Sequence, residues 1–284
     1  MPESPEVEVL TRFVRDRMVG RIIASLELEE FRVLKTRARP VDELVGRTVR
    51  EATRHGKHLA LATDGPVLVV SFGRAGWMRE TPEGAAGDPA GDPGEAVSTA
   101  APVATMAFRE GGGFVFTDAG AWLSLGLSIV DAATDIASVA GLGPDPLSGA
   151  FSRDDLDRVT RGRRKQLKAL LQEQESIAGI GNAYSDEILH VARLSPLMHA
   201  AALDEAQRER LFTAIADVLA GALAARNGVP IAELKAHKVA SMRVHGRTGE
   251  ACPVCGGEIA DIPGAKGAAQ YCPVCQGEEG VAEG

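Results

Sequence analysis

The feature that most constrains this chain is a pair of Cys-x-x-Cys motifs near the end of the sequence. Cys252 and Cys255 form the first motif, Cys272 and Cys275 form the second, and sixteen residues separate the two. Two such motifs can place four thiolates around one Zn²⁺ ion. Residues 250–276 contain few apolar side chains, so metal binding would replace a hydrophobic core there. We predict a structural zinc ribbon; free or redox-active thiols are the alternative.

Four Cys ligands would leave no open coordination position for water, so we do not expect this ion to catalyse a reaction. A metalloenzyme with an open zinc site would need fewer thiolate ligands, and we keep it as a less favoured alternative. In a reducing cytoplasm, this layout of paired cysteines favours a metal site over a disulfide framework. The N-terminal sequence MPESPEVEVL lacks a signal region, and no run approaches about 18 consecutive apolar residues. We therefore expect a cytoplasmic protein without a membrane partner.

Hydrophobic periodicity separates a β-rich first half from a helical second half. Apolar residues at helical spacing predict a helix over residues 5–19. Ser152 and Asp155 have the spacing of a capping box, and further helices are predicted for Ala183–Val191 and Asp204–Arg226. The predicted strands are Arg21–Leu28, Leu59–Thr63, Val67–Phe72, and a hairpin of Ala104–Arg109 with Phe114–Thr117.

These patterns divide the chain into five parts. The predicted parts are a β-rich domain over 1–130 with a flexible insertion at 81–102, a connector over 131–151, a helical domain over 152–249, the zinc ribbon over 250–276, and an acidic tail over 277–284.

A glycine loop before a helix forms the second motif. Gly179 and Gly181 allow a tight turn, and Asn182 stands where it can cap the following helix. Upstream, the segment 161–168 carries five basic residues in eight. Loop N–H groups beside a basic helix face suit a phosphodiester backbone. The alternatives are ordinary helix–turn–helix geometry for the glycines and a solvated surface for the basic run.

The N-terminus could supply a nucleophile. A small residue after Met1 favours removal of the initiator Met, and Pro2 would then expose a secondary amine. The pKa of an α-amino group is about 8, so much of this amine could be unprotonated at neutral pH. It could attack a sugar C1′ and form an iminium, with Glu3 and Glu6 close enough for acid–base chemistry. An unremarkable N-terminus is the alternative.

Lys57 stands between two β-like segments, in the sequence His55-Gly56-Lys57-His58-Leu59. A lysine at such a strand entrance can reach a phosphate or a leaving group; a plain surface lysine is the alternative. The net charge of −8 argues mildly against a nucleic-acid partner, although local charge matters more than the sum.

Taken in order, these motifs resemble those of the formamidopyrimidine-DNA glycosylase / endonuclease VIII family of bacterial base-excision repair enzymes. The resemblance spans nearly the whole chain apart from the insertion and the tail. The shared segments are Met1–Glu8, Gly56–Leu59, Gly179–Leu189, Val244–Gly249 and Tyr271–Gln276. It implies an α+β multidomain fold: an N-terminal β-sandwich with an N-terminal helix, followed by a helical helix–two-turn–helix domain with a zinc ribbon.

The resemblance also implies roles for individual residues. Pro2 would be the nucleophile, Glu3 the general acid/base that assists opening of the sugar ring, and Glu6 a supporting carboxylate. Lys57 and Asn182 would bind phosphates beside the lesion, with Lys168 a weaker candidate. Further DNA contacts are expected from Arg74, Tyr184 and Lys266.

The sequence departs from the family pattern at three places that concern how the protein recognises the damaged site. Arg74 stands where relatives often carry a wedging Met. The stretch Thr117–Trp122 lacks the Arg-Arg-Phe of the family's loop, and Trp122 or Trp77 could replace the lost aromatic wedge or belong to the core. Lys266 beside Gly267 stands where relatives commonly present an Arg, and lysine lacks its two-pronged geometry.

The chain is thus identified as a member of this family, and we expect a bifunctional DNA glycosylase/AP lyase. Its partner would be double-stranded DNA with damaged bases or abasic sites, its cofactor one structural Zn²⁺ ion, and its location the bacterial cytoplasm, at the nucleoid. We expect it to act as a monomer. A DNA-damage-binding protein without catalytic activity on the same scaffold is the alternative.

Overall fold

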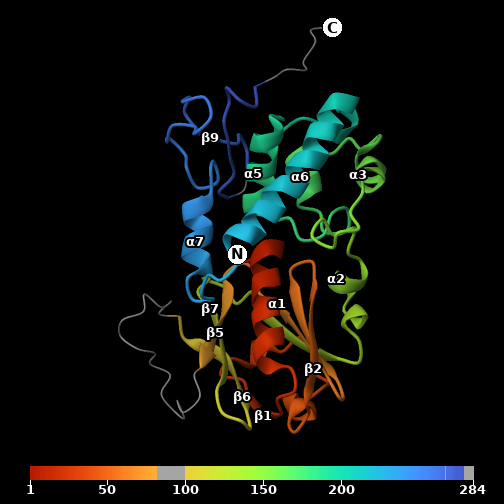
Figure 1. Cartoon of the computed structure of the whole chain (residues 1–284), viewed down its shortest axis with the longest axis vertical. Coiled ribbons are helices and arrows are strands. Elements are labelled where there is room, and N and C mark those ends of the chain that lie inside the picture. Colours follow the sequence, from red (N-terminus) through yellow and green to blue (C-terminus); the bar gives the residue numbers. More distant parts are fainter. Residues whose placement is uncertain (82–99, 266, 278–284) are drawn as a thin grey trace. The chain divides into compact units, whose positions relative to one another are not determined.

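A computed structural model describes residues 1–81, 100–265 and 267–277 (Figure 1). Lys266 and most of the predicted insertion and acidic tail lie outside these ranges. The chain forms two compact units. The first unit comprises Met1–Pro2, Glu6–Ala140 and Gly228–Leu234, and the second comprises Glu3–Pro5, Gly141–Asn227 and Lys235–Gly284.

The first unit is built on helix α1 (Ser4–Met18) and two antiparallel sheets, each four-stranded in the described residues. One sheet has the order β1-β6-β7-β5 and the other β2-β3-β4-β8. The strands are β1 (Ile23–Glu27), β2 (Val49–His55), β3 (His58–Thr63), β4 (Val67–Ser71), β5 (Gly76–Thr81), β6 (Pro102–Phe108), β7 (Gly113–Asp118) and β8 (Gly126–Val130). Short helices in this unit are η1 (Phe31–Val33), η2 (Val41–Leu44), η3 (Ala133–Asp135) and α2 (Ala137–Ala140).

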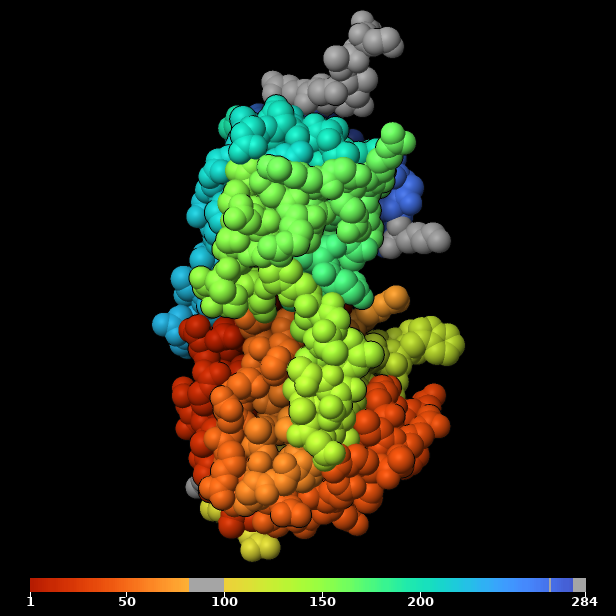
Figure 2. Space-filling view, turned by 90° about the vertical axis from the view of Figure 1, so that its right-hand side faces the viewer, coloured from red at the N-terminus to blue at the C-terminus, as the bar shows by residue number. Residues whose placement is uncertain are grey.

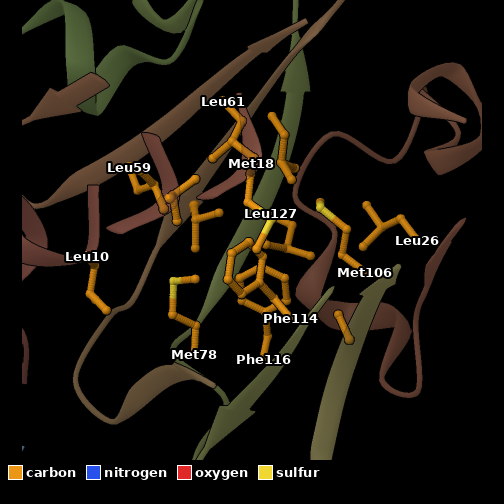
Figure 3. Close-up of a cluster of buried hydrophobic side chains, with 14 of the residues drawn as sticks. Leu10, Met18, Leu26, Leu59, Leu61, Met78, Met106, Phe114, Phe116 and Leu127 are labelled. Atoms are coloured by element: carbon orange, nitrogen blue, oxygen red, sulfur yellow. The ribbon is translucent and has the colours of Figure 1, made fainter. Parts of the chain in front are cut away.

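The two sheets and α1 share one hydrophobic core, which Figure 3 shows in part. Leu10 and Met18 come from the apolar face of α1, and Leu59 and Leu127 come from the second sheet. The first sheet contributes Leu26, Met78, Met106, Phe114 and Phe116. Burial of these side chains is the main force that holds such layers together. The predicted β-sandwich with an N-terminal helix is confirmed.

All five predicted strands are present, and the turn after Phe108 closes the predicted hairpin between β6 and β7. The prediction missed three strands of the first unit, β2, β5 and β8. Charged residues interrupt the apolar pattern of β2 and β5, and β8 is buried along its whole length, so it lacks the alternation of a half-buried strand.

The segment after β8 covers part of the outer face of the second sheet. Ala133 and Ile136 pack there against Ala60, Val69 and Val130. Figure 2 shows this segment in light green on the surface of the first unit. The long continuous segment of the first unit ends at Ala140, inside the stretch predicted to be a connector, and only Gly228–Leu234 is added to the unit later in the chain.

The second unit consists mainly of helices. They are α3 (Arg153–Thr160), α4 (Leu167–Leu171), α5 (Asn182–Ala192), η4 (Ala200–Ala202), α6 (Glu205–Ala225) and α7 (Leu234–Ser241), whose first residue is counted with the first unit. Two short strands follow, β9 (Ala260–Asp261) and β10 (Gln270–Tyr271). The capping box of Ser152 and Asp155 begins α3 as predicted, because each residue bonds the other's backbone N–H.

Helices α5 and α6 pack against each other around the core of this unit. Helix α7 was not predicted, because it is short and its exposed positions include both the charged Lys235 and the apolar Val239, so no apolar face stands out. Among the helices that the structure describes, none has the length and apolar composition needed to cross a bilayer.

Candidate functional site

The carboxylate of Glu3 lies at the N-terminus of α5, inside the second unit. Its Oε2 atom accepts hydrogen bonds from the backbone N–H groups of Gly181 at 2.5 Å and Tyr184 at 3.4 Å. Its Oε1 atom accepts one from the N–H of Ala183 at 3.0 Å. Glu3 is only 1% exposed. Unpaired N–H groups and the helix dipole both favour an anion at this position, so the N-terminus of α5 is a suitable binding site for a carboxylate.

Two glycines allow Glu3 to approach this closely. Gly179 has a φ of +89°, and a Cβ atom there would lie 2.6 Å from the Cβ of Ser4. A Cβ atom on Gly181 would lie 2.5 Å from the carboxyl carbon of Glu3. Ser4 also donates its backbone N–H to the carbonyl oxygen of Gly179 at 3.0 Å. The glycine loop therefore serves to receive residues 3–5.

This arrangement corrects two expectations about α5. The N-cap is Gly181, not Asn182, which is the first helical residue. The N–H groups that we expected to bind a phosphate are bonded to Glu3 instead. The side chain of Asn182 donates to the carbonyl oxygen of Ala268 and accepts from Gln172.

Tyr184 packs in the core of the second unit and is 1% exposed. This burial does not support the expected contact with DNA. Its ring instead lies under the ammonium of Lys238, which is 4.5 Å from the ring centroid and 3.2 Å from Oε1 of Glu3. Sequence reasoning had no basis for singling out Lys238, because 235 positions separate it from Glu3.

A second buried carboxylate, Asp186, joins three parts of the second unit. Its Oδ1 atom accepts a bond from Lys168 at 2.5 Å. Its Oδ2 atom is 2.7 Å from Nδ1 of His245 and 3.2 Å from the backbone N of Gln270. The next residue, Glu187, accepts the backbone N–H groups of residues 243–245. Sequence reasoning missed Asp186, because its partners Lys168, His245 and Gln270 lie far from it in the sequence.

Lys168 is directed into the protein. Besides Asp186, its ammonium bonds Ser185 Oγ at 3.0 Å and the carbonyl oxygen of Asn182 at 3.1 Å. Burial lowers the pKa of Lys168, and the charge of Asp186 opposes that shift. A direct contact of Lys168 with a phosphate stays a prediction, and the observed bonds suit a residue that holds Asn182 in place.

The basic run is largely neutralised by carboxylates of the same unit. Arg161 pairs with Asp157, while Arg163 and Lys165 both pair with Glu173. The hydrogen bond from Lys165 is the main reason that the pKa of Glu173 falls to about 2. Arg164 is exposed and has no ionic partner in the part of the chain that the structure describes. The continuous basic face that we expected is therefore reduced to single side chains.

Four further predicted site residues, Pro2, Glu6, Lys57 and Arg74, belong to the first unit. Pro2 is buried behind an exposed Met1, and Glu6 is fully buried on α1. Lys57 is half-buried in the tight turn between β2 and β3. Arg54 fixes this turn, because it donates to the carbonyl oxygen of Gly56 and pairs with Glu8 on α1 at 3.0 Å.

Glu8 therefore ties the N-terminal helix to the turn that carries Lys57. Burial would raise the pKa of Glu8, but hydrogen bonds from Arg12 and Arg54 outweigh burial and lower it. Glu8 stays ionised and keeps its pairing with Arg54 at neutral pH.

The two tryptophans have different environments. Trp77 is 9% exposed, lies in the first unit's core and donates its indole N–H to the carbonyl oxygen of Ile231. Trp122 is 87% exposed. Asp118 rigidifies its loop, because the carboxylate accepts the backbone N–H groups of Gly120, Ser124 and Leu125 at 2.7–2.9 Å.

The loop that carries Arg74 is hydrogen-bonded to the loop that carries Trp122. Ser124 Oγ accepts the backbone N–H of Arg74 at 2.9 Å. The guanidinium of Arg74 is exposed and has no ion-pair partner among residues 1–81, 100–265 and 267–277. The Ser124 hydroxyl accepts from the loop of Arg74 and donates to Asp118, which holds the loop of Trp122, so it links the two loops.

The four cysteines come together as predicted, with all their Sγ atoms within 4.8 Å of one another. The Sγ–Sγ distances are 3.8 Å for Cys252 and Cys275 and 3.5 Å for Cys255 and Cys272. Zn–S bonds of about 2.3 Å in a tetrahedron require S–S distances of about 3.8 Å. The cluster therefore has the right dimensions to hold one metal ion with no open position.

His190 lies behind the cysteine cluster, with its Nε2 atom 3.3 Å from Cys252 Sγ. Burial would raise the pKa of the Cys252 thiol, but hydrogen bonds from the backbone of Val254 and Cys255 and from His190 lower it to about 6. A thiolate is the form that binds a metal.

Comparison with known proteins places these features in one family. The model described as formamidopyrimidine-DNA glycosylase N-terminal domain matches residues 1–120, and that of the family's H2TH domain matches residues 142–231. The formamidopyrimidine-DNA glycosylase of Alkalilimnicola ehrlichii is 31% identical over 97% of this chain and 100% of its own length. The chain belongs to the formamidopyrimidine-DNA glycosylase family.

Other relatives agree with this membership. A formamidopyrimidine-DNA glycosylase-like protein of Mycobacterium tuberculosis, described as uncharacterized, is 47% identical over 48% of this chain and 84% of its own length. MutM in complex with DNA containing carbocyclic 8-oxo-G superposes with a TM-score of 0.83 at 26% identity, covering 98% of this chain and all of MutM. The Lactococcus lactis enzyme bound to FAPY-dG-containing DNA gives 0.83 at 27% identity, covering 97% and 100%.

We expect the Gly181→Ala substitution to destabilise the protein by about 1–3 kcal/mol, because the added methyl group would push Glu3 off the N–H groups of α5 and leave buried donors unpaired. Thermal unfolding measures this change. Gly221→Ala on α6 adds the same methyl group where nothing lies within 4 Å and serves as the control. A Gly181→Ala protein as stable as the parent would contradict the placement of Glu3.

We expect one equivalent of Zn²⁺ to be released when a thiol reagent titrates the four cysteines, since each thiolate would be a ligand. A chromogenic chelator measures the released metal. Cys252→Ser should lower the zinc content at least several-fold. The exposed Val254→Ser, on the same motif, should leave it unchanged. Purified protein with all four thiols reduced and no bound zinc would refute the zinc site.

Proposed function

We propose that this chain is a bifunctional DNA glycosylase/AP lyase that excises oxidised or ring-opened bases and cuts the strand by β- and δ-elimination. The observation that carries this proposal is the buried Glu3 carboxylate, fixed by α5 and directly adjacent in sequence to Pro2. The related enzymes support it, since their structures contain 8-oxo-G, FAPY-dG, an oxidised pyrimidine or an abasic site.

The ionised state of Glu3 suggests the order of proton transfers. After removal of Met1, Glu3 would accept a proton from the Pro2 amine, whose nitrogen would then attack C1′ as the glycosidic bond breaks. The base would leave with the bonding electron pair and take a proton from water. Glu3 would return this proton to O4′ when the C1′–O4′ bond opens and an iminium forms between C1′ and Pro2. Loss of a C2′ proton then expels the 3′ phosphate, and a second elimination expels the 5′ phosphate.

Several side chains would hold the DNA around the lesion. Lys57, on the turn fixed by Arg54, and Asn182 would bind flanking phosphates, and the exposed Arg74 would add a contact from its loop. Lys266 and Glu6 keep their proposed roles in DNA binding and in support of the active site. A Zn²⁺ ion in the four-cysteine cluster would shape the ribbon and take no part in the chemistry. The protein would act as a monomer on duplex DNA in the bacterial cytoplasm.

Trp122 is our candidate for the residue that fills the space left by a base removed from the stack. Excision requires the damaged nucleotide to leave the helix, which creates a gap beside the partner base. An exposed aromatic ring on a rigid loop can insert there and stack. Trp77 is excluded from this role because it belongs to the core.

Borohydride trapping tests the proposed function. We expect the protein, with Met1 removal verified by intact mass, to form a covalent adduct with a duplex containing an abasic site or 8-oxoguanine. A form extended by one uncleavable residue before Pro2 should form none, since its nitrogen is an amide. Glu3→Gln should slow adduct formation by about 10²-fold or more. Absence of an adduct from zinc-loaded protein without Met1 would refute the enzyme and leave damage binding.

We expect Trp122→Ala to weaken binding to lesion-containing duplex by about 10-fold, as stacking on one base contributes about 1–3 kcal/mol. The fluorescence of 2-aminopurine placed opposite the lesion measures stacking at the gap. Trp122→Phe should retain most of the effect. Because Trp122 is exposed, neither variant should change the unfolding temperature. Unchanged binding and fluorescence in Trp122→Ala would assign the wedge to another residue.

A further inference from the structure

Helix α7 buries a lysine against Glu3. Lys238 is 8% exposed, whereas its neighbours Lys235 and Val239 on the same helix are exposed. The Lys238 ammonium lies 3.2 Å from Oε1 of Glu3 and 4.5 Å from the centroid of the Tyr184 ring. A buried ammonium is costly unless a partner compensates for its lost hydration. Here a carboxylate and an aromatic face both do so.

The end of α7 is held in place by another buried cation. Arg226, fully buried after α6, donates to Ser241 Oγ at 3.2 Å. Ser241 in turn donates to the carbonyl oxygen of Lys238 at 2.8 Å. The guanidinium of Arg226 also lies 5.9 Å from the Tyr184 ring centroid. The backbone from which Lys238 extends is therefore fixed relative to α5 and α6.

Lys238 differs from the other donors to Glu3. The N–H groups of Gly181, Ala183 and Tyr184 belong to the backbone of the α5 N-terminus and anchor the carboxylate. Lys238 approaches Oε1 from a different helix and carries a full positive charge. A substitution of Lys238 changes a side chain only, so the three backbone N–H donors to Glu3 remain in the chain.

We propose that Lys238 is a positioning residue that orients Oε1 of Glu3 and keeps this carboxylate ionised at the start of the reaction. This inference rests on the proposed function of Glu3. In that scheme Glu3 must first accept a proton, and an adjacent ammonium favours the anionic form that can do so. A second ammonium, Lys168, also experiences the charge of Glu3. Lys238 acts through Glu3 and is not assigned a contact with DNA.

Lys238→Met tests the proposal, with Lys235→Met on the exposed side of α7 as the matched control. Both changes remove one charge from the same helix. We expect Lys238→Met to lower kcat for cleavage of abasic-site DNA by about 10-fold or more, with KM changed less than about 3-fold. Lys238→Arg should restore most of kcat. Lys235→Met should retain the parent's kcat.

A Glu3→Gln/Lys238→Met double variant shows whether the two residues act together. If Lys238 works through Glu3, the loss in the double variant will be far smaller than the product of the single losses. Thermal unfolding checks each variant, and Lys238→Gln, which keeps a hydrogen-bond donor, replaces Lys238→Met if the latter fails to fold.

The outcomes separate this inference from the proposed function. An inactive parent protein would refute the proposed function, and the role of Lys238 with it. An active parent, with Lys238→Met matching Lys235→Met in kcat, would refute only the role of Lys238. A fall in kcat without rescue by arginine, and with independent effects in the double variant, would show a purely structural lysine.

Discussion

The hydrogen bonds between the Glu3 carboxylate and the N-terminus of α5 are the contact on which the second unit's site depends. They explain how a helix whose N-cap, Gly181, has no side chain is capped: the cap comes from residue 3 of the same chain. They explain the two glycines, since a side chain at either position would collide with residues 3–4. In the sequence, this anchored carboxylate directly follows Pro2, the proline that would carry the nucleophile.

Helix α5 extends this arrangement through polar groups along its length. The N–H groups of its first turn bond Glu3. In its middle, Asp186 and Glu187 bond the segment 243–245, and in its last turn His190 contacts Cys252. Such buried groups are tolerated because each has a partner. The ribbon has only a small hydrophobic core. Its bonds to α5, the helix that also anchors Glu3, compensate for that small core.

Patterns within a few residues were sufficient to predict much of this protein. The β6–β7 hairpin, the Ser152 cap and the Cys spacing each depend on neighbours in the sequence, and all three were correct. The contacts of Lys238 and Asp186 join positions far apart, and only the fold brings them together. The basic run was misleading for a different reason: its acidic partners Asp157 and Glu173 are near in sequence but lie just beyond the two ends of the run.

An acidic protein that binds DNA must rely on a few well-placed groups rather than on overall charge. The net charge is −8, and much of the basic run is paired internally. The candidate DNA contacts lie on turns that buried polar groups hold rigid: Arg54 fixes the turn of Lys57, and Asp118 with Ser124 fixes the loops of Trp122 and Arg74. Rigid placement reduces the entropy lost on binding, so single contacts can contribute more. The internal ion pairs of the basic run therefore need not oppose DNA binding, because the candidate contacts lie on other turns, which the Arg54–Glu8 pair and the hydrogen bonds of Asp118 hold rigid.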